Sequence, residues 1–509
     1  MAATSKNTKK SAKKKQAPRK AKPRGPAPLK VCIASSEVAP LAKTGGLADV
    51  TAALAAYLHR AGHEVRLLLP FYSSIDTSAL EIRPVPGLQR IPMRIAHREG
   101  HFSIDATTLP GTDLEIYLLR CPELYDRDGI YTGGDDEHLR FILLSRAAIV
   151  MCQYLRFAPD VMSCHDWHTS LIPLYLRTLY AWDSLFANTR TTLTIHNIGY
   201  QGMFGAGIIA DLDLDGSVHL LHQDDLGQGR INFLKTGLLY ANLLTTVSPT
   251  YAREIQGDEY GMGMQDVLRA RSNVLVGILN GVDYREWNPA TDPLIPANYS
   301  PDDLSGKAAC KRELKERLGL PGDGDAPLIG VVSRLVHQKG IELLERTLPA
   351  LMSRRRFDMA ILGSGEPRFE SFFTKLQQHY PDRVCFYRGY NNRLAHMIEA
   401  GADLFLMPSL YEPCGLNQMY SLKYGTVPIV RETGGLADSV EQINPANGSG
   451  TGILFRDYNE TGLAWAINAG LDLYGNKALL QEIRLNGMRQ DFSWETQTAR
   501  YVELFRALK

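Results

Sequence analysis

The sequence contains no apolar stretch long enough to cross a membrane. A spanning helix needs about 20 consecutive apolar residues, and no uncharged run of that kind occurs in the 509 residues. The basic start of the chain is also followed by no apolar core of the type found in secretory signals. We therefore expect no contact with a membrane.

Cysteine is scarce, and its spacing indicates no pairing. The seven cysteines are scattered, odd in number and form no C-x-x-C pair. This distribution argues against a disulfide framework and against a zinc knuckle, and it favours a reducing compartment. The expected location is therefore the cytoplasm.

Motifs for two common nucleotide-binding classes are missing or broken. No G-x-x-x-x-G-K-[S/T] segment is present, which argues against a P-loop kinase. Gly363-Ser364-Gly365 begins like a dinucleotide-binding fingerprint, but Arg368 stands where the third glycine belongs. A nicotinamide oxidoreductase is therefore a disfavoured alternative, and no cofactor is expected.

Acidic residues are absent from the first 30 residues, which hold 11 of the 56 Lys and Arg residues. The rest of the chain carries 45 basic and 55 acidic side chains, so the body is acidic. With so few apolar residues, segment 1–29 is expected to be a disordered basic tail. Contact with a polyanion such as nucleic acid is the alternative, and a transit peptide is disfavoured because the tail is rich in Lys rather than in Arg and Ser.

From residue 30 onward, short apolar runs alternate with helix-length segments. The first series of predicted strands includes Val31–Ala34, Glu64–Leu69, Thr191–Ile195 and Leu243–Val247. The second series follows a Pro-rich segment and comprises Leu328–Val332, Met359–Leu362, Val384–Tyr387, Leu404–Met407 and Val427–Val430. Strands that alternate with helices indicate parallel sheets covered on both faces.

The two series predict an α/β protein with two doubly wound domains, 30–279 and 280–491, that meet at a hinge near 280–301. The hexapeptide T-G-G-L-A-D occurs at Thr44–Asp49 and again at Thr433–Asp438. Each copy follows a predicted strand and opens a predicted helix. Matching Gly-rich helix starts on two sheets indicate a deep inter-domain cleft lined from both sides.

Several of these segments are suited to binding a diphosphate. Glycines at a strand-to-helix junction leave backbone N–H groups free for an anion, although a simple tight turn is the alternative. Lys43 precedes the first Gly-Gly pair. Arg334 and Lys339 follow a strand at the edge where open α/β sheets bind ligands. Charge-assisted hydrogen bonds of this kind are typically worth about 1.5–3 kcal/mol each.

Three further polar clusters have competing interpretations. His165-Asp166-Trp167-His168 follows an apolar run, where a histidine is often only a packed core residue. Its two histidines lack further ligands at a metal-binding spacing, and the D-x-D pattern in 211–215 lies in a Gly-flanked region that favours a solvated loop. No metal is therefore expected. The segment 412–415 offers a carboxylate and backbone N–H groups at the mouth of the second sheet.

Taken in order, these segments resemble the glycogen and starch synthases, and the first hexapeptide with its preceding lysine is similar to the bacterial form. The resemblance runs from about residue 30 to the end of the chain. It rests on the following segments: Lys43–Asp49, His165–His168, Ser248–Tyr251, Asn280–Asp283, Ser333–Gly340, Glu412–Gly415 and Thr433–Asp438.

The resemblance implies two Rossmann-like domains that close over a sugar nucleotide, with a last helix, 492–509, that returns to the first domain. It implies catalytic roles for His165, Arg334, Lys339 and Glu412. The implied substrate-binding residues are Lys43, Gly45, Gly46, Asp49, Asn280, Tyr390, Cys414, Gly415, Thr433, Gly434 and Gly435.

The resemblance assigns these residues to different parts of the substrate. Arg334 and Lys339 would stabilise the diphosphate as leaving group, with the Gly45-Gly46 loop and the amides of Thr433–Gly435 approaching it. Glu412 would contact glucose hydroxyls, and His165 would hold the sugar near the reacting carbon. Tyr390 would stack on the base, with simple packing as the alternative. Many relatives have a glutamate where this chain has Tyr420, so the ribose contacts differ.

The implied reaction adds glucose from ADP-glucose to the non-reducing end of an α-1,4-glucan with retention. The sequence offers no evident carboxylate pair for double displacement, so we expect same-face attack with the diphosphate as leaving group. Two alternatives are kept. One is a related transferase that uses UDP-glucose or a short acceptor, and the other is a non-catalytic glucan-binding scaffold.

Overall fold

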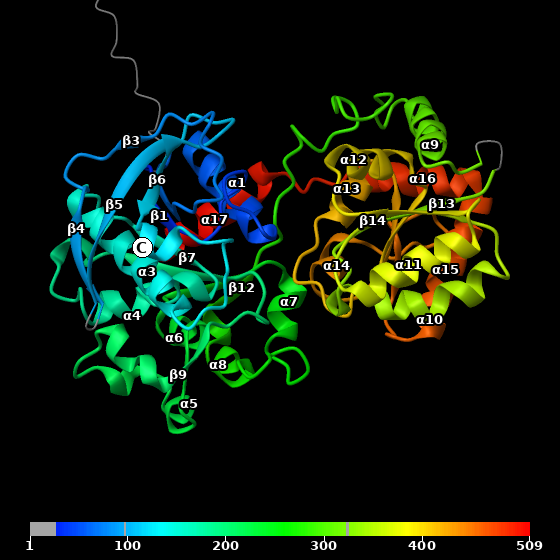
Figure 1. The fold of residues 1–509 in the computed structure, drawn as a ribbon. Helices are drawn as coiled ribbons and strands as arrows, with labels where there is room; N and C mark the ends of the chain where they lie inside the picture. The colour runs from blue at the N-terminus through cyan, green and yellow to red at the C-terminus, as the bar shows by residue number, and fades with distance from the viewer. Residues whose placement is uncertain (1–26, 96–97, 322–324) are drawn as a thin grey trace, which may run out of the picture.

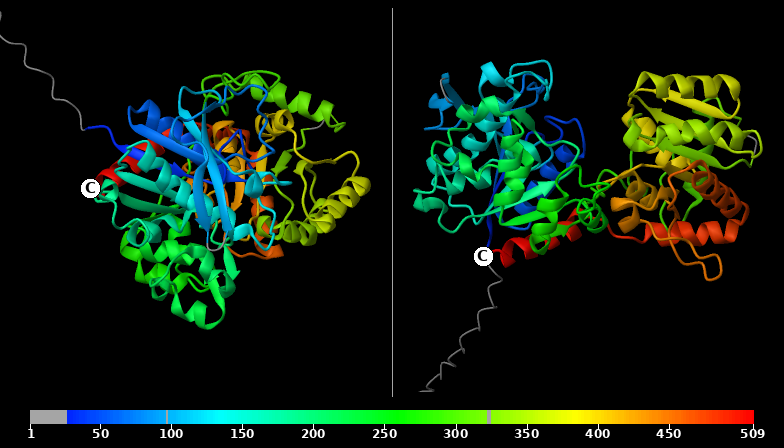
Figure 2. Two further views of the ribbon diagram at one scale, coloured as in Figure 1. Left: turned by 60° about the vertical axis from the view of Figure 1, so that its left-hand side comes forward. Right: turned by 90° about the horizontal axis from the view of Figure 1, so that it is seen from below.

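The structure, a computed structural model, describes residues 27–95, 98–321 and 325–509. Within them the chain forms two α/β lobes that lie side by side (Figures 1 and 2). Two chain segments pass between the lobes, one after residue 277 and one before residue 494. The basic tail predicted at 1–29 lies almost wholly outside the described residues.

The first lobe is built on a largely parallel sheet. Its strands are ordered β12-β11-β8-β7-β1-β2-β6, followed by an antiparallel extension. The parallel strands are β1 (Lys30–Ala34), β2 (Glu64–Pro70), β6 (Glu115–Arg120), β7 (Val161–His165), β8 (Arg190–Ile195), β11 (Leu243–Thr246) and β12 (Leu275–Gly277). The strands predicted for this lobe are therefore confirmed.

The antiparallel extension was not predicted. Strand β5 (Arg98–Thr108) pairs with β6, and the short strands β3 (Arg83–Pro84) and β4 (Ile91–Ile95) pair with β5. The sequence of β5 alternates, with Phe102, Ile104 and Ala106 buried, which is typical of a strand that buries one face. The sheet of the first lobe is therefore mixed rather than wholly parallel.

The second lobe has a parallel sheet ordered β15-β14-β13-β16-β17-β18. Its strands are β13 (Leu328–Val332), β14 (Asp358–Gly363), β15 (Val384–Arg388), β16 (Leu404–Met407), β17 (Val427–Arg431) and β18 (Ile453–Phe455). Apolar clusters fill both faces of this sheet. The predicted class, two α/β domains of the doubly wound type, is confirmed.

Helices cover the sheets of both lobes (Figure 1). Those that precede the hinge are α1 (Gly46–Arg60), α2 (Pro122–Tyr125), α3 (Glu137–Tyr154), α4 (Ile172–Arg177), α5 (Gln223–Gly227), α6 (Phe233–Tyr240), α7 (Pro249–Glu254) and α8 (Gln265–Ala270). Those of the second lobe are α9 (Ser305–Arg317), α10 (Ile341–Met352), α11 (Pro367–His379), α12 (Asn392–Gly401), α13 (Asn417–Lys423), α14 (Gly434–Ser439), α15 (Glu460–Gly475) and α16 (Lys477–Met488).

Both sheets contain a point where the strand order reverses. In the first lobe the chain leaves β1 toward β2 and later continues from β7 on the other side of β1. In the second lobe the same reversal separates β13 from β16. Ligands of open α/β sheets bind outside the carboxyl ends of the strands at such reversals. The topology therefore predicts two facing half-sites.

Three lysines on one face of α9 tie that helix to the edge of the second sheet at which its strands begin. Lys307, Lys311 and Lys315 are four residues apart and so project from one face of the helix. Lys315 pairs with Asp358 at 3.0 Å and Lys311 with Asp403 at 2.6 Å, each at the start of a strand. Lys307 donates to the Thr426 hydroxyl at 2.7 Å. These three lysines therefore hold α9 to the sheet.

The last helix, α17 (Trp494–Ala507), packs on α1 of the first lobe (Figure 1, red). Trp494, Tyr501 and Phe505 belong to the core of that lobe and are almost completely buried. The Trp494 ring lies 6.5 Å from the Tyr57 ring. The first lobe is thus completed by residues from the end of the chain.

Replacement of Trp494 by alanine should strongly destabilise the first lobe. Trp494 is 3% exposed, and truncation of a buried Trp typically costs about 3–5 kcal/mol because it leaves a cavity. Calorimetry should show a lower melting temperature. Trp465→Ala is the matched control because Trp465 on α15 is 53% exposed. Equal melting temperatures for the two variants would contradict the packing role of α17.

Candidate active site

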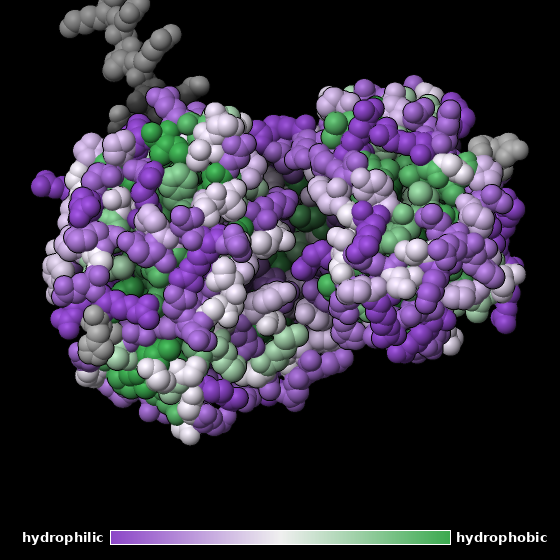
Figure 3. Space-filling view, in the orientation of Figure 1, coloured by the Kyte–Doolittle hydropathy of each residue, from purple (hydrophilic) through white to green (hydrophobic). Residues whose placement is uncertain are grey.

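A cavity of about 630 Å³ lies between the lobes at the two strand-order reversals. Its walls include Gly45 and Gly46 from the first lobe, and Arg334, Lys339 and Glu412 from the second. The surface of the molecule is hollowed between the lobes (Figure 3). Asn280, Cys414 and Gly415 lie in the same wall, so the structure brings together eight of the predicted site residues.

On the first lobe, the carboxylate of Glu37 organises the Gly-rich loop that opens α1. It accepts hydrogen bonds from the Thr44 hydroxyl and N–H, both at 2.6 Å, and from the Gly45 N–H at 3.1 Å. The Tyr131 hydroxyl donates to the same carboxylate at 2.6 Å. The Gly45 N–H, which belongs to the loop expected to face the ligand, is thus already used, and the loop is held in place.

Gly45 and Gly46 themselves face open space. A side chain on either residue would meet no atom within 4 Å. The glycines are therefore not required by packing inside the protein. Their lack of side chains instead leaves room for a ligand to approach the backbone at the start of α1, where the helix dipole favours negative charge.

His165 does not reach the cavity. Its ring is completely buried at the end of β7, between the Ser163 hydroxyl at 3.1 Å and the His196 ring at 3.0 Å. Burial lowers the pKa of His165 to about 3, so the ring is neutral. Two other histidines, His168 and His196, line the cavity, and burial lowers the pKa of both. The His165 ring thus lies behind His196, and its assignment to the sugar stays a prediction.

Asp166 lies in the cavity wall, with a strained backbone and a buried carboxyl group. Its φ angle is 51°, which is unusual for a residue other than glycine, and such strain concentrates at functional sites. The carboxylate accepts the His196 N–H at 2.7 Å. Burial raises the pKa of Asp166 to about 7, although hydrogen bonds from the His196 and Asn197 backbone oppose that rise.

On the second lobe, Lys339 and Glu412 form an ion pair in the cavity wall. The Lys339 ammonium lies 2.6 Å from the Glu412 carboxylate, which also accepts the Ser409 hydroxyl at 3.0 Å. Glu412 is 5% exposed, so the pair is shielded from solvent. Gly340 makes this arrangement possible, since it has a φ angle of 70° and any side chain there would clash with the Pro408 carbonyl.

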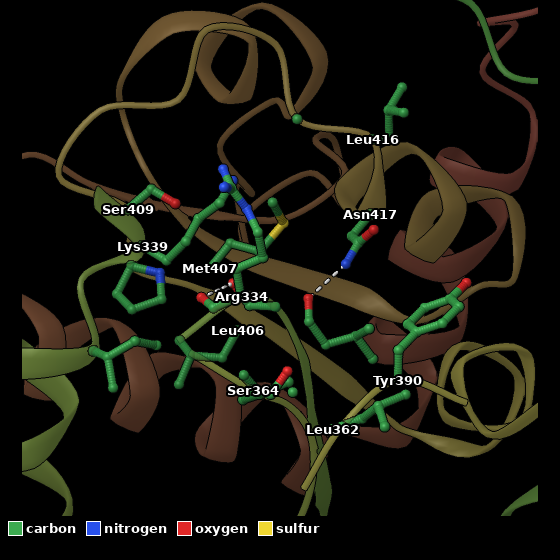
Figure 4. Close-up of a pocket in the computed structure, with 18 residues that line it drawn as sticks. Arg334, Lys339, Leu362, Ser364, Tyr390, Leu406, Met407, Ser409, Leu416 and Asn417 are labelled. Atoms are coloured by element: carbon green, nitrogen blue, oxygen red, sulfur yellow. Dashed lines mark hydrogen bonds between the residues drawn. The ribbon is translucent and has the colours of Figure 1, made fainter. Parts of the chain in front are cut away.

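A smaller pocket of about 300 Å³ continues from Arg334 and Lys339 toward Tyr390 (Figure 4). Arg334 is exposed and Lys339 lies across the pocket from Tyr390. The Tyr390 side chain is 72% exposed, so one face of its ring is free for stacking. Asn417 closes one wall by donating to the Val332 carbonyl at 2.7 Å.

Lys43 and Asp49 lie in a neighbouring cavity of about 530 Å³ that also includes Tyr390. They form an ion pair at 2.7 Å. Burial raises the pKa of Asp49, and the nearby Lys43 charge opposes that shift. Both residues therefore face the inter-lobe space on the side of Tyr390 rather than the cavity that contains Glu412.

Asn280 and Cys414 meet where the chain first crosses between the lobes. The Asn280 N–H donates to the Cys414 sulfur at 3.4 Å. The Asn280 side-chain oxygen is buried without a hydrogen-bond partner in the described residues, and it lies in the wall of the main cavity. An unpaired buried acceptor at a cavity is suited to a ligand hydroxyl. Burial raises the pKa of Cys414 to about 12, so its thiol stays protonated.

Thr433, Gly434 and Gly435 do not line the cavity. The Thr433 hydroxyl and the Gly434 N–H donate to Glu254 of the first lobe, at 2.9 and 3.0 Å. The Gly435 N–H donates to the Glu412 carbonyl at 3.1 Å. These donors are thus engaged within the protein and support the turn that carries Glu412, and their direct contact with a ligand stays a prediction.

The side chains of the two segments considered as metal sites, 165–168 and 211–215, contact other side chains of the protein. Asp211 pairs with His138 at 2.8 Å, and Asp213 pairs with Arg146. His168 stacks on Tyr131 with ring centres 4.9 Å apart. In the part of the chain that the structure describes, no cluster of three or more His, Cys, Asp or Glu side chains is arranged to hold a metal ion. Nor does any helix there have the length and apolar content to span a membrane.

Comparisons with known proteins cover both lobes. Residues 30–270 match the model of the starch synthase catalytic domain, and residues 312–484 match that of group 1 glycosyl transferases. Glycogen synthase 1 of Geobacter sulfurreducens is 44% identical over 490 residues, which cover 94% of this chain and 97% of the relative. The chain belongs to the glycogen and starch synthase family.

A second bacterial relative and a solved plant structure also support the family, and a more distant structure shares the fold. The glycogen synthase of Myxococcus xanthus is 45% identical over 487 residues, with 94% of this chain and 99% of the relative covered. The starch synthase IV catalytic domain of Arabidopsis thaliana, solved with ADP and acarbose, has a TM-score of 0.86 at 33% identity, covering 95% and 99% of the two chains. Sucrose-phosphate synthase of Thermosynechococcus elongatus, at 17% identity and a TM-score of 0.56, shares the fold.

Members of the family are glucosyltransferases, and several site residues of this member were not found from its sequence. His196 follows a predicted strand just as His165 does, so the same signal was available for it. Glu37, Tyr131 and Glu254 had no such signal, because their role depends on contacts with distant segments. Only the folded chain brings these carboxylates to the starts of α1 and α14.

The pKa of Asp166 predicts a pH-dependent stability. The unfolded chain releases this proton near its ordinary value of 3.8, whereas the folded protein retains it to about pH 7. Between these values the folded state binds more protons, so this residue's contribution to the free energy of unfolding falls as pH rises. Asp166→Asn should lack that decline.

Urea unfolding from pH 4 to pH 8 should therefore show Asp166→Asn gaining stability relative to the parent up to about pH 7, and then a constant difference. Asp266→Asn is the control, because Asp266 is 87% exposed. A difference between Asp166→Asn and the parent that does not change with pH would contradict the buried, protonated carboxyl group.

Proposed function

We propose that this protein adds glucose from ADP-glucose to the non-reducing end of an α-1,4-glucan and retains the α configuration. The observation that carries the proposal is the arrangement of Arg334, Lys339 and Glu412 opposite the open Gly45-Gly46 backbone across one cavity. Those groups match the negative and the hydroxyl-rich parts of a sugar nucleotide.

The diphosphate fits between Arg334 and Lys339 on one side and the start of α1 on the other. Departure of the sugar increases negative charge on the diphosphate, so fixed donors there stabilise the transition state more than the ground state. One such donor is commonly worth about 2.7–4 kcal/mol of barrier. Lys339 must exchange its Glu412 partner for phosphate, which also frees Glu412 to bind the sugar.

The glucose fits beside Glu412 at the end of the cavity that holds His196 and Asn280. Glu412 accepts hydrogen bonds from sugar hydroxyls, and Asn280 supplies an acceptor that has no other partner in the described residues. The backbone N–H groups of Cys414 and Gly415 complete this end. His196 is neutral because burial lowers its pKa, so it adds no positive charge next to the developing cationic carbon.

The nucleoside extends from the diphosphate into the pocket of Tyr390, whose exposed ring is available to stack on a base. A relative at 33% identity was solved with ADP, which supports adenine as the base. Lys43 and Asp49 line the adjoining cavity and are suited to phosphate and ribose contacts. Tyr420 stacks on Trp287 at 3.9 Å there and offers no carboxylate to the ribose.

Retention follows from attack on the face that the diphosphate leaves. The glucan 4-hydroxyl forms the new bond to the anomeric carbon while the bond to the diphosphate oxygen breaks, and the departing phosphate takes the hydroxyl proton. Glu412 still accepts the Ser409 hydroxyl after Lys339 turns to the phosphate, and the proposal assigns its carboxylate to sugar hydroxyls rather than to attack on the anomeric carbon. Closure of the two lobes would exclude water that would otherwise hydrolyse the donor.

We also propose a cytoplasmic location and a polyanion contact for the tail. All seven cysteines are free, and six are buried, which suits a reducing compartment. The uninterrupted basic charge of residues 1–30 suits nonspecific attraction to a polyanion.

Loss of either cationic group should reduce turnover sharply. We expect Lys339→Ala and Arg334→Ala each to lower kcat by at least about 100-fold, because each removes a donor to the leaving group. Release of ADP with glycogen as acceptor measures this. Arg368→Ala is the control, since Arg368 is 62% exposed on α11 and pairs with Glu345. Turnover near that of the parent in either site variant would contradict the assigned role.

The donor preference is tested directly. Purified protein with glycogen should release ADP from ADP-glucose faster than it releases UDP from UDP-glucose, and a chelator should leave the rate unchanged. A higher kcat/KM for UDP-glucose would favour the alternative transferase. No transfer from either donor, with glycogen still bound, would favour a non-catalytic scaffold.

A further inference from the structure

Helices α7 and α14, from different lobes, cap each other. Asp438 in the last turn of α14 accepts the Thr250 N–H at 2.6 Å and the Thr250 hydroxyl at 2.7 Å, in the first turn of α7. Glu254 at the end of α7 accepts the Gly434 N–H at 3.0 Å and the Thr433 hydroxyl at 2.9 Å, where α14 begins. Each helix thus supplies a carboxylate to the start of the other.

The environment of this reciprocal contact strengthens it. Thr433 is 1% exposed, so the Glu254 hydrogen bonds are shielded from water. Burial raises the pKa of Glu254, while the bonds from Gly434 and Thr433 oppose the rise. The start of a helix carries partial positive charge, which favours an ionised carboxylate. Losing such an acceptor would leave a buried donor unpaired, which is costly.

The contact continues directly into the turn that carries Glu412. The Gly435 N–H donates to the carbonyls of Glu412 and Pro413, at 3.1 and 3.2 Å. A side chain on Gly434 would clash with the Glu412 carbonyl, so the two backbones lie in direct contact. Movement at the start of α14 therefore moves Glu412.

The first lobe also holds this turn from its own side. Ser248, the residue before α7, donates from its hydroxyl to the Pro413 carbonyl at 2.6 Å. The same hydroxyl accepts the Tyr251 N–H at 3.1 Å and so caps α7. The Glu412 turn belongs to the second lobe by sequence, yet α7 and α14 fix it from both lobes.

We propose that Glu254 and Asp438 are positioning residues for the transfer reaction. Their reciprocal contact keeps Glu412 at a fixed place relative to the first-lobe residues, His196 and Asn280, that line the sugar end of the cavity. The inference rests on the proposed glucosyl transfer, because it assigns these carboxylates to that reaction. Neither carboxylate touches the substrate, and both act through the 412–415 turn.

The experiment compares Glu254→Ala and Asp438→Ala with the conservative variants Glu254→Gln and Asp438→Asn. A small displacement of a reacting group lowers turnover strongly. We therefore expect each alanine variant to lower kcat about 10-fold, with KM for ADP-glucose changed less than about 3-fold. Gln and Asn retain an acceptor oxygen and should restore at least half of the loss. Asp266→Ala on α8 is the control, since its side chain is 87% exposed.

A second measurement needs no substrate. Amide hydrogen exchange of the segment 433–436 should become faster in Glu254→Ala and return toward the parent rate in Glu254→Gln. Alanine variants with the parent's kcat well below their melting temperature would overturn the inference, even if the melting temperature falls. An inactive parent protein would instead refute the proposed function, and the exchange rates would still test whether the carboxylates hold α14.

Discussion

The backbone N–H groups that open a helix have no acceptor inside that helix, and in this protein that requirement organises the space between the lobes. In each copy of T-G-G-L-A-D a glutamate from elsewhere in the chain accepts N–H groups where the loop meets the helix. Glu37, from the same lobe, accepts those of Thr44 and Gly45 just before α1. Glu254 caps the second across the gap. Identical local sequences thereby serve different purposes, because the origin of the acceptor differs.

The first copy becomes a rigid, open backbone at the cavity wall, and the second becomes part of the joint between lobes. This division explains why the glycines differ in what surrounds them. Gly45 and Gly46 face space, whereas Gly434 and Gly435 press against the carbonyls of the 412–415 turn. A ligand has access to one pair, and the protein itself occupies the other. The cationic groups that we propose for the diphosphate, Arg334 and Lys339, come from the segment after β13.

Much of the fold could be predicted because the parallel strands are buried apolar runs bounded by glycine and polar residues. Strand β13 was predicted with the observed ends. Strand β5 was not, since its alternation of Phe102, Ile104 and Ala106 with polar residues gives a weaker signal than a continuous run. The lysines of α9 look like a solvated face in sequence, although Lys315 is buried against Asp358.

The candidate site was predictable where position along a strand decides function. Arg334, Lys339 and Glu412 each follow a strand of the second sheet, and topology brings those ends together. His165 was assigned through the resemblance of the 165–168 segment, and neither spacing nor composition indicates that His196, which follows the next strand, lies nearer the opening. The ring of one shields that of the other, and only the three-dimensional path of β7 and β8 decides which is outermost.

The return of α17 to the first lobe makes the second lobe an insertion within the first. Trp494, Tyr501 and Phe505 complete a core most of whose other members precede residue 283, with Cys414, Met419 and Leu422 added from the second lobe. During synthesis the ribosome must therefore produce the entire second lobe before the first can close its hydrophobic interior. The face of α1 that packs on α17 therefore stays uncovered until residues 494–507 emerge.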